Sequence, residues 1–549
     1  MIYMKKFKFK SVVAMASAKM SIKSAAIVLA SSTLISALLG LFRDRLLNSY
    51  YLGTYPTGID AYTAAFTIPD FMFFILTSGA LAVSFIPVFN QRLMSSNKKS
   101  AWELSSSLLN LLAILTLITS ILIMIFADPL IRYIVSPGLD EAGMVLAINM
   151  TRVIAINPFL FSIATVLTSI QQAVRRFVFY AFAPAIYNIG IIIGITWFTG
   201  GINLFGIQIF EGGIMGVAMG VILGATMQLI VALIGLFGLG FDYTFKIYWK
   251  NQGFRTILKL LPSRSLDQGI DYINGIVNTN LSSRMGAGAV RSFNQASNLH
   301  QMPVNLIGVA ISTAFFPKLT EELGAGDNTE FYNTFRKALR MILWIALPVA
   351  TIAFFTRGYV TSFVSNIGNN DSNGTIASVL GMLCIAIFAR SIFHIASRGF
   401  YACQDTKTPF RVSIVAIGLT IALSVGFFML GWGVDGLGLA QSIGALVEII
   451  ILLYILQRRS KNKILNHSFW KALIRICVAT VIAGCVAFSL TKFIPLRVTD
   501  VSLVITMPKF LLIAGLSILA YLIASYFLNL DEIQPVVRYL KKVLFRNAK

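Results

Sequence analysis

The segment SAAIVLASSTLISALLGLFRDRLL, residues 24–47, decides the fold class of this chain. It carries no charge from Ser24 to Phe42, and about 20 mostly apolar residues are enough for a helix to cross a bilayer. The same segment then continues through Arg43, Asp44 and Arg45. A charged side chain at the centre of a membrane costs about 2.5 kcal/mol or more. Charges at or near that depth are therefore expected to serve a function.

The composition of the whole chain is that of a polytopic membrane protein. Hydrophobic residues make up 57% of the 549 residues and charged residues only 12%, and the mean hydropathy is +0.78. Soluble domains carry about 25% charged residues, which excludes an ordinary soluble fold. The net charge of +23 is explained by the Lys and Arg that collect in cytoplasmic loops of membrane proteins. No nucleic-acid partner is expected.

Fourteen runs of the sequence are long and apolar enough to cross a membrane as helices. We therefore predict an all-α protein with fourteen transmembrane helices. The predicted spans lie near residues 24–47, 60–91, 102–127, 144–170, 179–198, 214–238, 257–283, 289–317, 336–356, 375–401, 410–431, 434–457, 471–491 and 508–529.

The charges between these runs predict the orientation of the helices. Alternate gaps are rich in Lys and Arg, such as the gap with Lys98 and Lys99, whereas the gaps between them hold few, such as Lys492. By the positive-inside rule, both termini are cytoplasmic. The basic segment 1–23 is interpreted as a cytoplasmic arm, with a cleaved signal peptide as the alternative. The four cysteines have no metal-binding or disulfide spacing.

Two similar stretches indicate an internal repeat. SFIPVFNQRL, residues 84–93, closes the second run, and AFFPKLTEEL, residues 314–323, closes the eighth, so that Pro87 and Pro317 are 230 positions apart. A parallel repeat of six helices is a known plan of transporters, although chance placement of proline at helix ends is the alternative. The predicted parts are the arm 1–23, an N-lobe 24–238, a C-lobe 239–457, and two further helices with a basic cytoplasmic tail over 458–549.

Polar residues recur at helical spacing on four of the predicted spans. A polar stripe on an apolar helix is expected to line a cavity, although a lone Asn can simply join helices and an Arg near a helix end can reach the interface. His394 is as well explained by packing as by proton transfer. The stripes are Ser36, Gly40 and Arg43; Arg264, Asp267, Asp271, Asn274 and Asn278; Arg291, Asn294, Asn298, Gln301 and Asn305; and Arg390, His394 and Arg398.

No enzyme site is evident in the sequence. The nucleotide-binding pattern GxxxxGK[ST] is absent, so we do not expect ATP hydrolysis by this chain. No cofactor or metal is predicted. Transport is then expected to be driven by a Na⁺ or H⁺ gradient, by the membrane potential, or by consumption of the cargo.

Several motifs, spread from about residue 24 to about residue 457, resemble the MurJ (MviN) family of lipid II flippases, which belongs to the same superfamily as the MATE exporters. The motif that ends in Asp-x-Lys-Thr-Pro is the most specific of them. The matching pieces are LLGLFRDRLL, IDAYTAAFTIPDF, SGALAVSFIPVF, SPGL, YAFAPAIYNIG, MPVNLIGVAISTAFFPKL and GFYACQDTKTPFRV.

The resemblance implies two six-helix lobes in a V-shaped bundle that alternates between inward-open and outward-open states. The cargo would be a polyprenyl-pyrophosphate-linked precursor of peptidoglycan, and the last two helices would line a groove for its lipid tail. The setting would be the bacterial cytoplasmic membrane, and the function would be cell-wall biogenesis and cell shape. Membrane lipids and proteins of cell-wall synthesis and division are the implied partners, and we expect a monomer.

The resemblance also assigns roles to individual residues. Arg43 and Asp44 match an Arg-Asp pair whose arginine meets the pyrophosphate, a task that suits the planar guanidinium fork. Asp60 matches an acidic residue at the start of the second helix, and Ser36 matches a serine of the first. In some members an acid on the seventh helix belongs to a sodium site, a role open to Asp267 or Asp271.

Three cationic residues of the family pattern are missing. Ala37, Phe73 and Asn298 occupy the places of arginines, with Ser297 beside Asn298 in the place of an acid, and Ser78 replaces an acid before the second-helix glycine. If the cargo is still a pyrophosphate lipid, positive charge must come from elsewhere. We predict that Arg291 and Arg398 supply it, with Arg264 and Arg390 as further candidates.

Three functions remain open from the sequence. The first is flipping of lipid II. The second is transport of another polyprenyl-linked glycan or of a different amphiphile. The third is a non-transporting membrane scaffold of the cell-wall machinery, for which the chain offers basic loops but no soluble docking domain.

Overall fold

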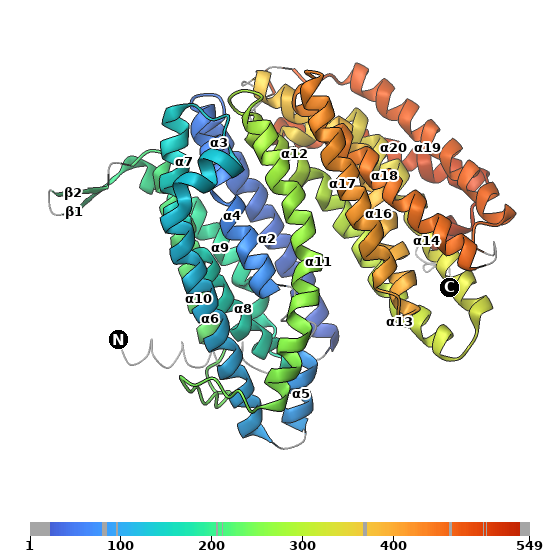
Figure 1. The fold of residues 1–549 in the computed structure, drawn as a ribbon. Coiled ribbons are helices and arrows are strands. Elements are labelled where there is room, and N and C mark those ends of the chain that lie inside the picture. The colour runs from blue at the N-terminus through green and yellow to red at the C-terminus, as the bar shows by residue number, and fades with distance from the viewer. Residues whose placement is uncertain are drawn as a thin grey trace, which may run out of the picture. The chain divides into compact units, whose positions relative to one another are not determined.

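The computed structural model describes most of the chain (Figure 1). The described residues are 22–78, 85–94, 97–204, 207–210, 212–365, 370–460, 464–497, 499–500 and 502–538. Within these ranges, the side chains of 22–27, 30, 78, 94, 202–204, 207–210, 260–268, 270–271 and 370–373 are outside the description. The predicted cytoplasmic arm therefore lies almost entirely outside the described residues, as does the end of the basic tail.

The helices group into two compact units, residues 1–290 and 291–549. The first unit contains α2 (Ile22–Tyr51), α3 (Pro56–Ala65), α4 (Thr67–Phe73), η1 (Phe74–Ser78), α5 (Ile86–Met94), α6 (Lys98–Pro129), η3 (Leu130–Val135), α7 (Glu141–Ile154), α8 (Asn157–Ala173), α9 (Val178–Thr196), η4 (Phe198–Gly200), α10 (Met215–Ile234) and α11 (Gln252–Ser283). The second contains α12 (Ala289–Val304), η5 (Asn305–Val309), α13 (Ala310–Gly324), α14 (Asn328–Phe355), α15 (Arg357–Thr361), α16 (Asn370–Ala402), α17 (Lys407–Met429), α18 (Gly433–Arg459), α19 (His467–Phe493), α20 (Leu503–Phe527) and η6 (Asp531–Ile533).

The all-helical membrane fold predicted from the sequence is confirmed. Among the described residues, 12 helical segments are long and apolar enough to cross a membrane. Each coincides with one of the predicted spans. The two remaining predicted spans coincide with α2, which has 30 residues, and α11, which has 32. The structure is therefore consistent with fourteen spans, although only twelve helical segments of the described residues are both long and apolar enough to count as candidate spans.

A short hairpin between α9 and α10 was not predicted. Strand β1 (Ile202–Leu204) pairs antiparallel with β2 (Ile207–Phe210), and Leu204 lies opposite Ile207. Three or four residues are too few to produce a recognisable alternation in the sequence. The hairpin lies in one of the predicted gaps, so it leaves the helical plan unchanged.

The second and eighth spans, which the sequence predicts to be repeats of each other, share a local irregularity. The second span contains the π-helical segment η1 before Pro87 of α5, and the eighth contains the π-helical segment η5 before Pro317 of α13. The two π segments start 231 positions apart and the two prolines 230. Because π-helical segments are rare, their recurrence at matching places supports the repeat.

The contacts divide the chain at a different place from the repeat. Helix α11 packs against α4, η1 and η3 of the first unit, and the rings of Phe74 and Tyr272 stack with their centroids 4.6 Å apart. The boundary between compact units therefore falls after residue 290, whereas the repeat places the lobe boundary between 238 and 239. The seventh span belongs to the second half by sequence and to the first unit by packing.

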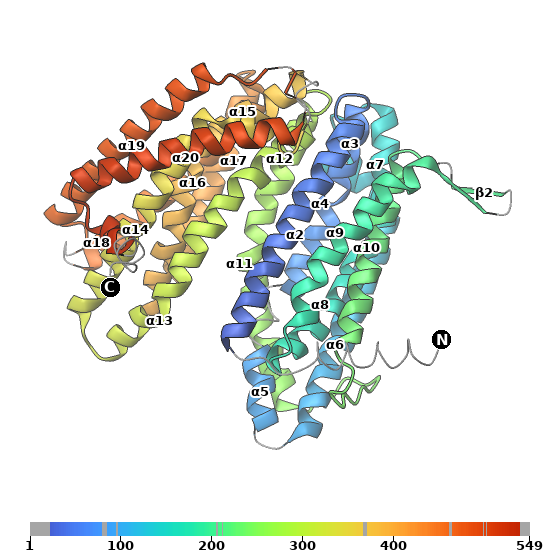
Figure 2. The same cartoon turned by 180° about the vertical axis from the view of Figure 1, so that it is seen from behind.

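Glycines set the close contact of α9 with α10 (Figure 2). A Cβ atom at Gly190 would lie 2.2 Å from the Cα of Gly224, and one at Gly194 would lie 2.5 Å from the Cα of Gly220. Small residues four positions apart allow helix backbones to approach closely in membranes. This contact matters for the site described below, because α9 also packs against α2.

The motif containing Asp-x-Lys-Thr-Pro forms the turn between α16 and α17. The Asp405 carboxylate accepts hydrogen bonds from the backbone N–H groups of Lys407 and Thr408 and from the Thr408 hydroxyl, and pairs with Arg459 at 2.6 Å. Burial alone would raise the pKa of the Asp405 carboxyl, but these hydrogen bonds and the ion pair outweigh it and lower the pKa to about 2. The Arg459 guanidinium also lies over the Phe400 ring. The motif thus ties the end of α18 to this turn.

Candidate functional site

Arg43 lies at the centre of a polar cluster in the first unit. Its Nη2 and Nε donate to one carboxylate oxygen of Asp44, at 3.0 and 3.3 Å, and its Nη1 donates to Oδ1 of Asn188 on α9 at 2.9 Å. The Arg43 side chain is 23% exposed and that of Asp44 is 10% exposed. The two partners fix the guanidinium plane, and the Arg43 side chain as a whole stays partly exposed.

The polar stripe predicted on the first span lies on one face, and Asn188 is in contact with it. The Asn188 amide nitrogen donates to the carbonyl and hydroxyl oxygens of Ser36, at 3.2 and 3.4 Å, and to the Pro184 carbonyl at 3.2 Å. A Cβ atom at Gly40 would lie 3.9 Å from the same amide. Ser36, Gly40 and Arg43 therefore surround a single buried asparagine.

Asn188 was missed as a site residue by the sequence analysis. It stands in the motif YAFAPAIYNIG, four residues after Pro184, and is the only strongly polar side chain in α9 apart from tyrosines and Thr196. An amide in so apolar a helix could have signalled a partner. Its contact with Arg43 joins residues 145 positions apart, which no local pattern indicates.

Aromatic rings occupy the place of the missing second-helix arginine. The Phe73 ring packs against that of Phe161 with centroids 5.7 Å apart, and Phe161 packs edge-on against Tyr187 at 5.2 Å. Tyr187 directly precedes Asn188, the partner of Arg43, on α9. The cluster around Arg43 is thus bordered by aromatic rings where the family pattern has a cation.

Asp60 has a structural role in this conformation. Its side chain is fully buried, and its Oδ2 accepts a hydrogen bond of 2.6 Å from the backbone N–H of Gly288. Gly288 has a positive φ of 84°. The carboxylate therefore anchors the turn after α11 to α3. This burial does not support the direct substrate contact predicted for Asp60.

A ladder of amide side chains lies on the exposed face of α12 and η5 in the second unit. Asn298 donates to Asn294 at 3.1 Å, and Gln301 donates to Asn305 at 3.3 Å. Asn298 and Asn305 are exposed and the other two are partly so. Exposed amides are costly against hydrocarbon. The ladder is therefore expected to face water or a polar ligand, as predicted for this stripe.

The two arginines predicted to replace the missing cations differ in accessibility. Arg291 is only 4% exposed, and its guanidinium donates to the side-chain amide oxygen of Gln295. Arg398 is partly exposed and donates to Ser312 and Thr313 at 3.0 and 2.9 Å. The burial of Arg291 does not support a headgroup contact in this conformation, whereas Arg398 remains accessible.

The seventh-span candidates are only partly described. The side chains of Arg264, Asp267 and Asp271 lie outside the described residues, so their predicted roles stay predictions. Asn274 and Asn278 on the same helix are buried, and the Asn278 amide donates to the backbone carbonyl of Asn274 at 2.9 Å. Arg390 and His394 on α16 are both partly exposed.

A buried carboxylate on α18 was also missed by the sequence analysis. Glu448 is 7% exposed, and one of its oxygens accepts a hydrogen bond of 2.6 Å from the Ser413 hydroxyl on α17. Thr420 of α17 lies against Gly444 of α18. The polar residues of the eleventh span thus face the twelfth. Among the residues that the structure describes, no three His, Cys, Asp or Glu side chains are grouped as metal ligands.

Comparisons with solved structures agree with this architecture. A lipid II flippase MurJ in an inward closed conformation matches with a TM-score of 0.71 at 22% identity, covering 95% of this chain and 99% of that one. An inward-facing multidrug resistance MATE family transporter of the MOP superfamily matches with a TM-score of 0.64 at 19% identity, covering 80% and 98%. At these identities the likeness establishes the fold.

Sequence comparisons identify the family. The probable lipid II flippase MurJ of Buchnera aphidicola subsp. Acyrthosiphon pisum is 28% identical over 460 residues, covering 83% of this chain and 88% of the relative. The lipid II flippase MurJ of Burkholderia cenocepacia is 26% identical over 452 residues, covering 80% and 84%. The family model described as lipid II flippase MurJ matches residues 48–507. Since that match covers far more than half of the sequence, this chain belongs to the MurJ family of lipid II flippases.

Proposed function

We propose that this protein translocates lipid II, the undecaprenyl-pyrophosphate-linked precursor of peptidoglycan, across the bacterial cytoplasmic membrane by alternating access. It is a transporter and performs no chemistry on its cargo. Family membership supports the cargo class. The observation that carries the proposal is the partly exposed Arg43 side chain, whose guanidinium is held in a fixed plane within an apolar helix.

The bonding of Arg43 leaves capacity for a phosphate. An arginine has five N–H donors, of which three are used by Asp44 and Asn188 among the described residues. One N–H on each terminal nitrogen is therefore not used by these two residues, and the guanidinium fork is the geometry that pairs with phosphate oxygens. Asp44 keeps the cation compensated when no cargo is bound, so the empty site carries no isolated buried charge.

Transport of a different amphiphile is the second candidate function. The aromatic chain from Phe73 to Tyr187 stands where the family pattern has an arginine. Aromatic faces favour an apolar or sugar-bearing group over a second phosphate. A polyprenyl-linked glycan with a smaller negative charge fits this arrangement.

A coupling role for intramembrane carboxylates is part of the proposal. A carboxylate in an apolar helix can exchange a proton or bind a cation. Asp267 and Asp271 of α11 stay the first candidates, and the buried Glu448 of α18 is a further one because it is held by Ser413. The driving force would be a Na⁺ gradient, a H⁺ gradient or the membrane potential.

Orientation and partners follow from the same proposal. Both termini would be cytoplasmic, as the distribution of Lys and Arg predicts. The protein would act as a monomer among membrane lipids, alongside proteins of cell-wall synthesis and division, and without a nucleic-acid partner.

Depletion of the protein in its native host tests the function. We expect lipid II to accumulate in the inner leaflet, because synthesis continues while translocation stops. The depleted host is then given a plasmid that carries either the wild-type gene or the Arg43→Ala variant, and the two strains are compared. Accumulation of another lipid-linked sugar would favour the second candidate, and normal levels of all lipid-linked precursors would contradict transport altogether.

A further inference from the structure

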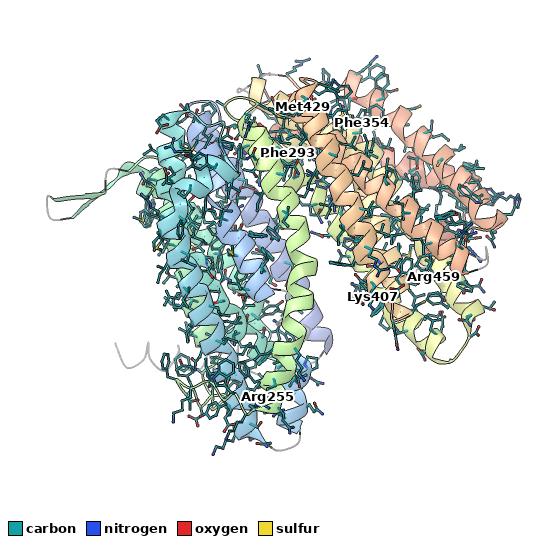
Figure 3. All side chains as sticks on the ribbon, viewed as in Figure 1. Arg255, Phe293, Phe354, Lys407, Met429 and Arg459 are labelled. Atoms are coloured by element: carbon teal, nitrogen blue, oxygen red, sulfur yellow. The ribbon has the colours of Figure 1, made fainter. Side chains whose placement is uncertain are left out.

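The loop between α10 and α11, residues 236–251, exposes an unusual set of aromatic side chains. Phe245 is 81% exposed, Phe237 64% and Trp249 56%. Lys246 and Lys250 are interspersed among them and are exposed as well. Figure 1 shows this coil beside the start of α6, at the same end of the first unit where Figure 3 labels Arg255. Aromatic rings mixed with lysines are typical of the membrane–water interface.

Polar side chains of α6 hold this loop in one shape. The Ser106 and Ser107 hydroxyls accept from the backbone N–H groups of Thr244 and Tyr248, at 3.2 and 2.8 Å. The Asn110 amide donates to the carbonyls of Thr244 and Lys246, at 2.9 and 3.0 Å. These hydrogen bonds hold the loop backbone in place, and its aromatic side chains remain exposed.

A basic pocket lies where this loop meets the starts of α6 and α11. The pocket has a volume of about 820 Å³, and its lining includes three cationic side chains, Arg92, Lys99 and Lys250, against one carboxylate, that of Glu103. The local excess of positive charge predicts an anionic ligand. The pocket is built entirely from residues of the first unit and includes none of the residues bonded to Arg43.

The backbone of the pocket adds to its positive character. Asn97 caps α6 by accepting from the Ser100 N–H, and Asn251 caps α11 by accepting from Gly253 and Phe254. Two long helices thus begin at this pocket, each with the positive end of its dipole toward it. Arg92 donates to the Ser100 hydroxyl at 2.6 Å, which places its guanidinium at the first turn of α6. A Cβ atom at Gly253, in the first turn of α11, would lie 2.5 Å from the Arg92 Nε.

The length of α6 places the pocket at the level of lipid headgroups. Its uncharged stretch runs from Leu104 to Ala127, which is roughly 36 Å at about 1.5 Å per residue, enough to fill a hydrocarbon core of about 30 Å. Glu103 and the rest of the pocket therefore lie just outside the hydrocarbon. The exposed aromatic rings of the loop are then at the depth where such rings partition.

We propose that this pocket binds the headgroup phosphate of an anionic phospholipid in the leaflet on the Lys-rich side of the membrane, while the loop aromatics anchor beside it. A basic pocket between transmembrane helices is the expected receptor for such a headgroup. A lipid is favoured over a soluble phosphate because exposed aromatic rings have no role toward a soluble ion. This site is independent of the cargo site around Arg43.

Lipid titration of the full-length protein in neutral detergent tests the proposal. Dioleoylphosphatidylglycerol and dioleoylphosphatidylcholine are added in mixed micelles, and bound lipid is counted by native mass spectrometry. We expect selective retention of phosphatidylglycerol. The double variant Lys99→Gln and Lys250→Gln should need roughly 25 times more of it for half-saturation, since each of the two lysines near a charged headgroup contributes a factor of about five.

The matched control is the double variant Lys98→Gln and Lys246→Gln, which removes the same charge from neighbouring exposed positions outside the pocket lining. It should bind as the wild type does. Equal retention of the two lipids, or wild-type binding by the pocket variant, would overturn the proposal. Displacement of the bound lipid by millimolar inorganic phosphate would assign the site to a soluble anion instead. The single variants provide the same comparison if the double variant does not fold.

Discussion

At the scale of single residues, Arg43 shows how a membrane protein can keep a charge in an apolar helix. The guanidinium is compensated by Asp44 from its own helix and oriented by Asn188 from α9. Asp44 both compensates the charge and helps to orient the guanidinium, and Asn188 adds a second, neutral contact that orients it. Two N–H groups are not used by Asp44 and Asn188, and a planar guanidinium fork suits recognition of a phosphate.

Replacement of Arg43 provides the first test at this scale. Arg43→Ala should abolish complementation of a depleted host, because a charge-assisted hydrogen-bonding contact with phosphate contributes about 1.5–3 kcal/mol, which is roughly a tenfold to hundredfold change in affinity. Arg43→Lys should restore growth only in part, since an ammonium lacks the planar fork. Growth curves and the amount of protein in the membrane are measured together.

Arg45→Ala is the matched control for that experiment, because it removes a neighbouring charge of the same type on the same helix. It should leave most of the activity. Full growth with Arg43→Ala at normal protein levels would contradict the assignment of the headgroup contact, whatever the control shows.

The spacing of residues in the sequence does not predict which side chains are buried. Arg291 and Asn298 are seven positions apart and share a face of an ideal helix, yet Arg291 is 4% exposed and Asn298 is exposed. Likewise, the acidic residue Asp60 was predicted to meet substrate but is fully buried against Gly288. Spacing gives the direction of a side chain, whereas exposure depends on which neighbour covers it.

At the scale of elements, long apolar runs were predictable and local irregularities were not. The predicted span 410–431 corresponds to α17 (Lys407–Met429), because hydropathy over 20 residues is a strong signal. The π-helical segments η1 and η5 have no sequence signature of their own. They are found only in the structure, where the second and eighth spans each contain one π-helical segment at a matching place.

The glycine contact between α9 and α10 carries a prediction about stability. Gly220→Leu would put a side chain where Gly194 approaches, since even a Cβ atom there would lie 2.5 Å from the Gly194 Cα. The helices must separate, which also shifts α9 and its Asn188 away from Arg43. We expect a thermal midpoint lowered by several degrees in detergent, together with reduced transport.

Gly418→Leu on α17 is the control, because nothing lies within 4 Å of a Cβ atom at Gly418. It should leave the midpoint nearly unchanged. An unchanged midpoint for Gly220→Leu would mean that separating α9 from α10 does not lower the stability. Asn188 would then be positioned by α2 alone.

At the scale of the whole molecule, membership of the family and the order of the spans followed from the sequence, whereas the division into compact units did not. The repeat assigns the seventh span to the second half, but α11 packs on the first unit through contacts such as Phe74 with Tyr272. Covalent order and packing partner are set by different forces. A repeat is defined by similarity between two segments of the sequence, whereas a compact unit is defined by the apolar faces that are buried against one another.

Coupling of transport to an ion gradient is a property of the whole molecule, and the intramembrane carboxylates are its test. The test variants are Asp267→Asn, Asp271→Asn and Glu448→Gln. Each replaces a carboxylate by an amide of similar size that cannot exchange a proton. If one of these carboxylates couples transport, its variant should still flip lipid II slowly in proteoliposomes. The imposed Na⁺ gradient, H⁺ gradient or membrane potential should then no longer accelerate flipping.

Ser413→Ala separates coupling from structure at Glu448. It removes the hydrogen bond of 2.6 Å that holds this carboxylate but leaves the ionisable group in place, so a structural role predicts the same defect as Glu448→Gln and a coupling role predicts a milder one. The rate of fluorescent lipid II translocation is compared with and without each gradient for every variant. If each gradient accelerates all the variants as much as the wild type, none of the three carboxylates couples transport. The coupling group would then lie elsewhere in the molecule. Only a wild type that no gradient accelerates would leave consumption of the cargo as the driving force.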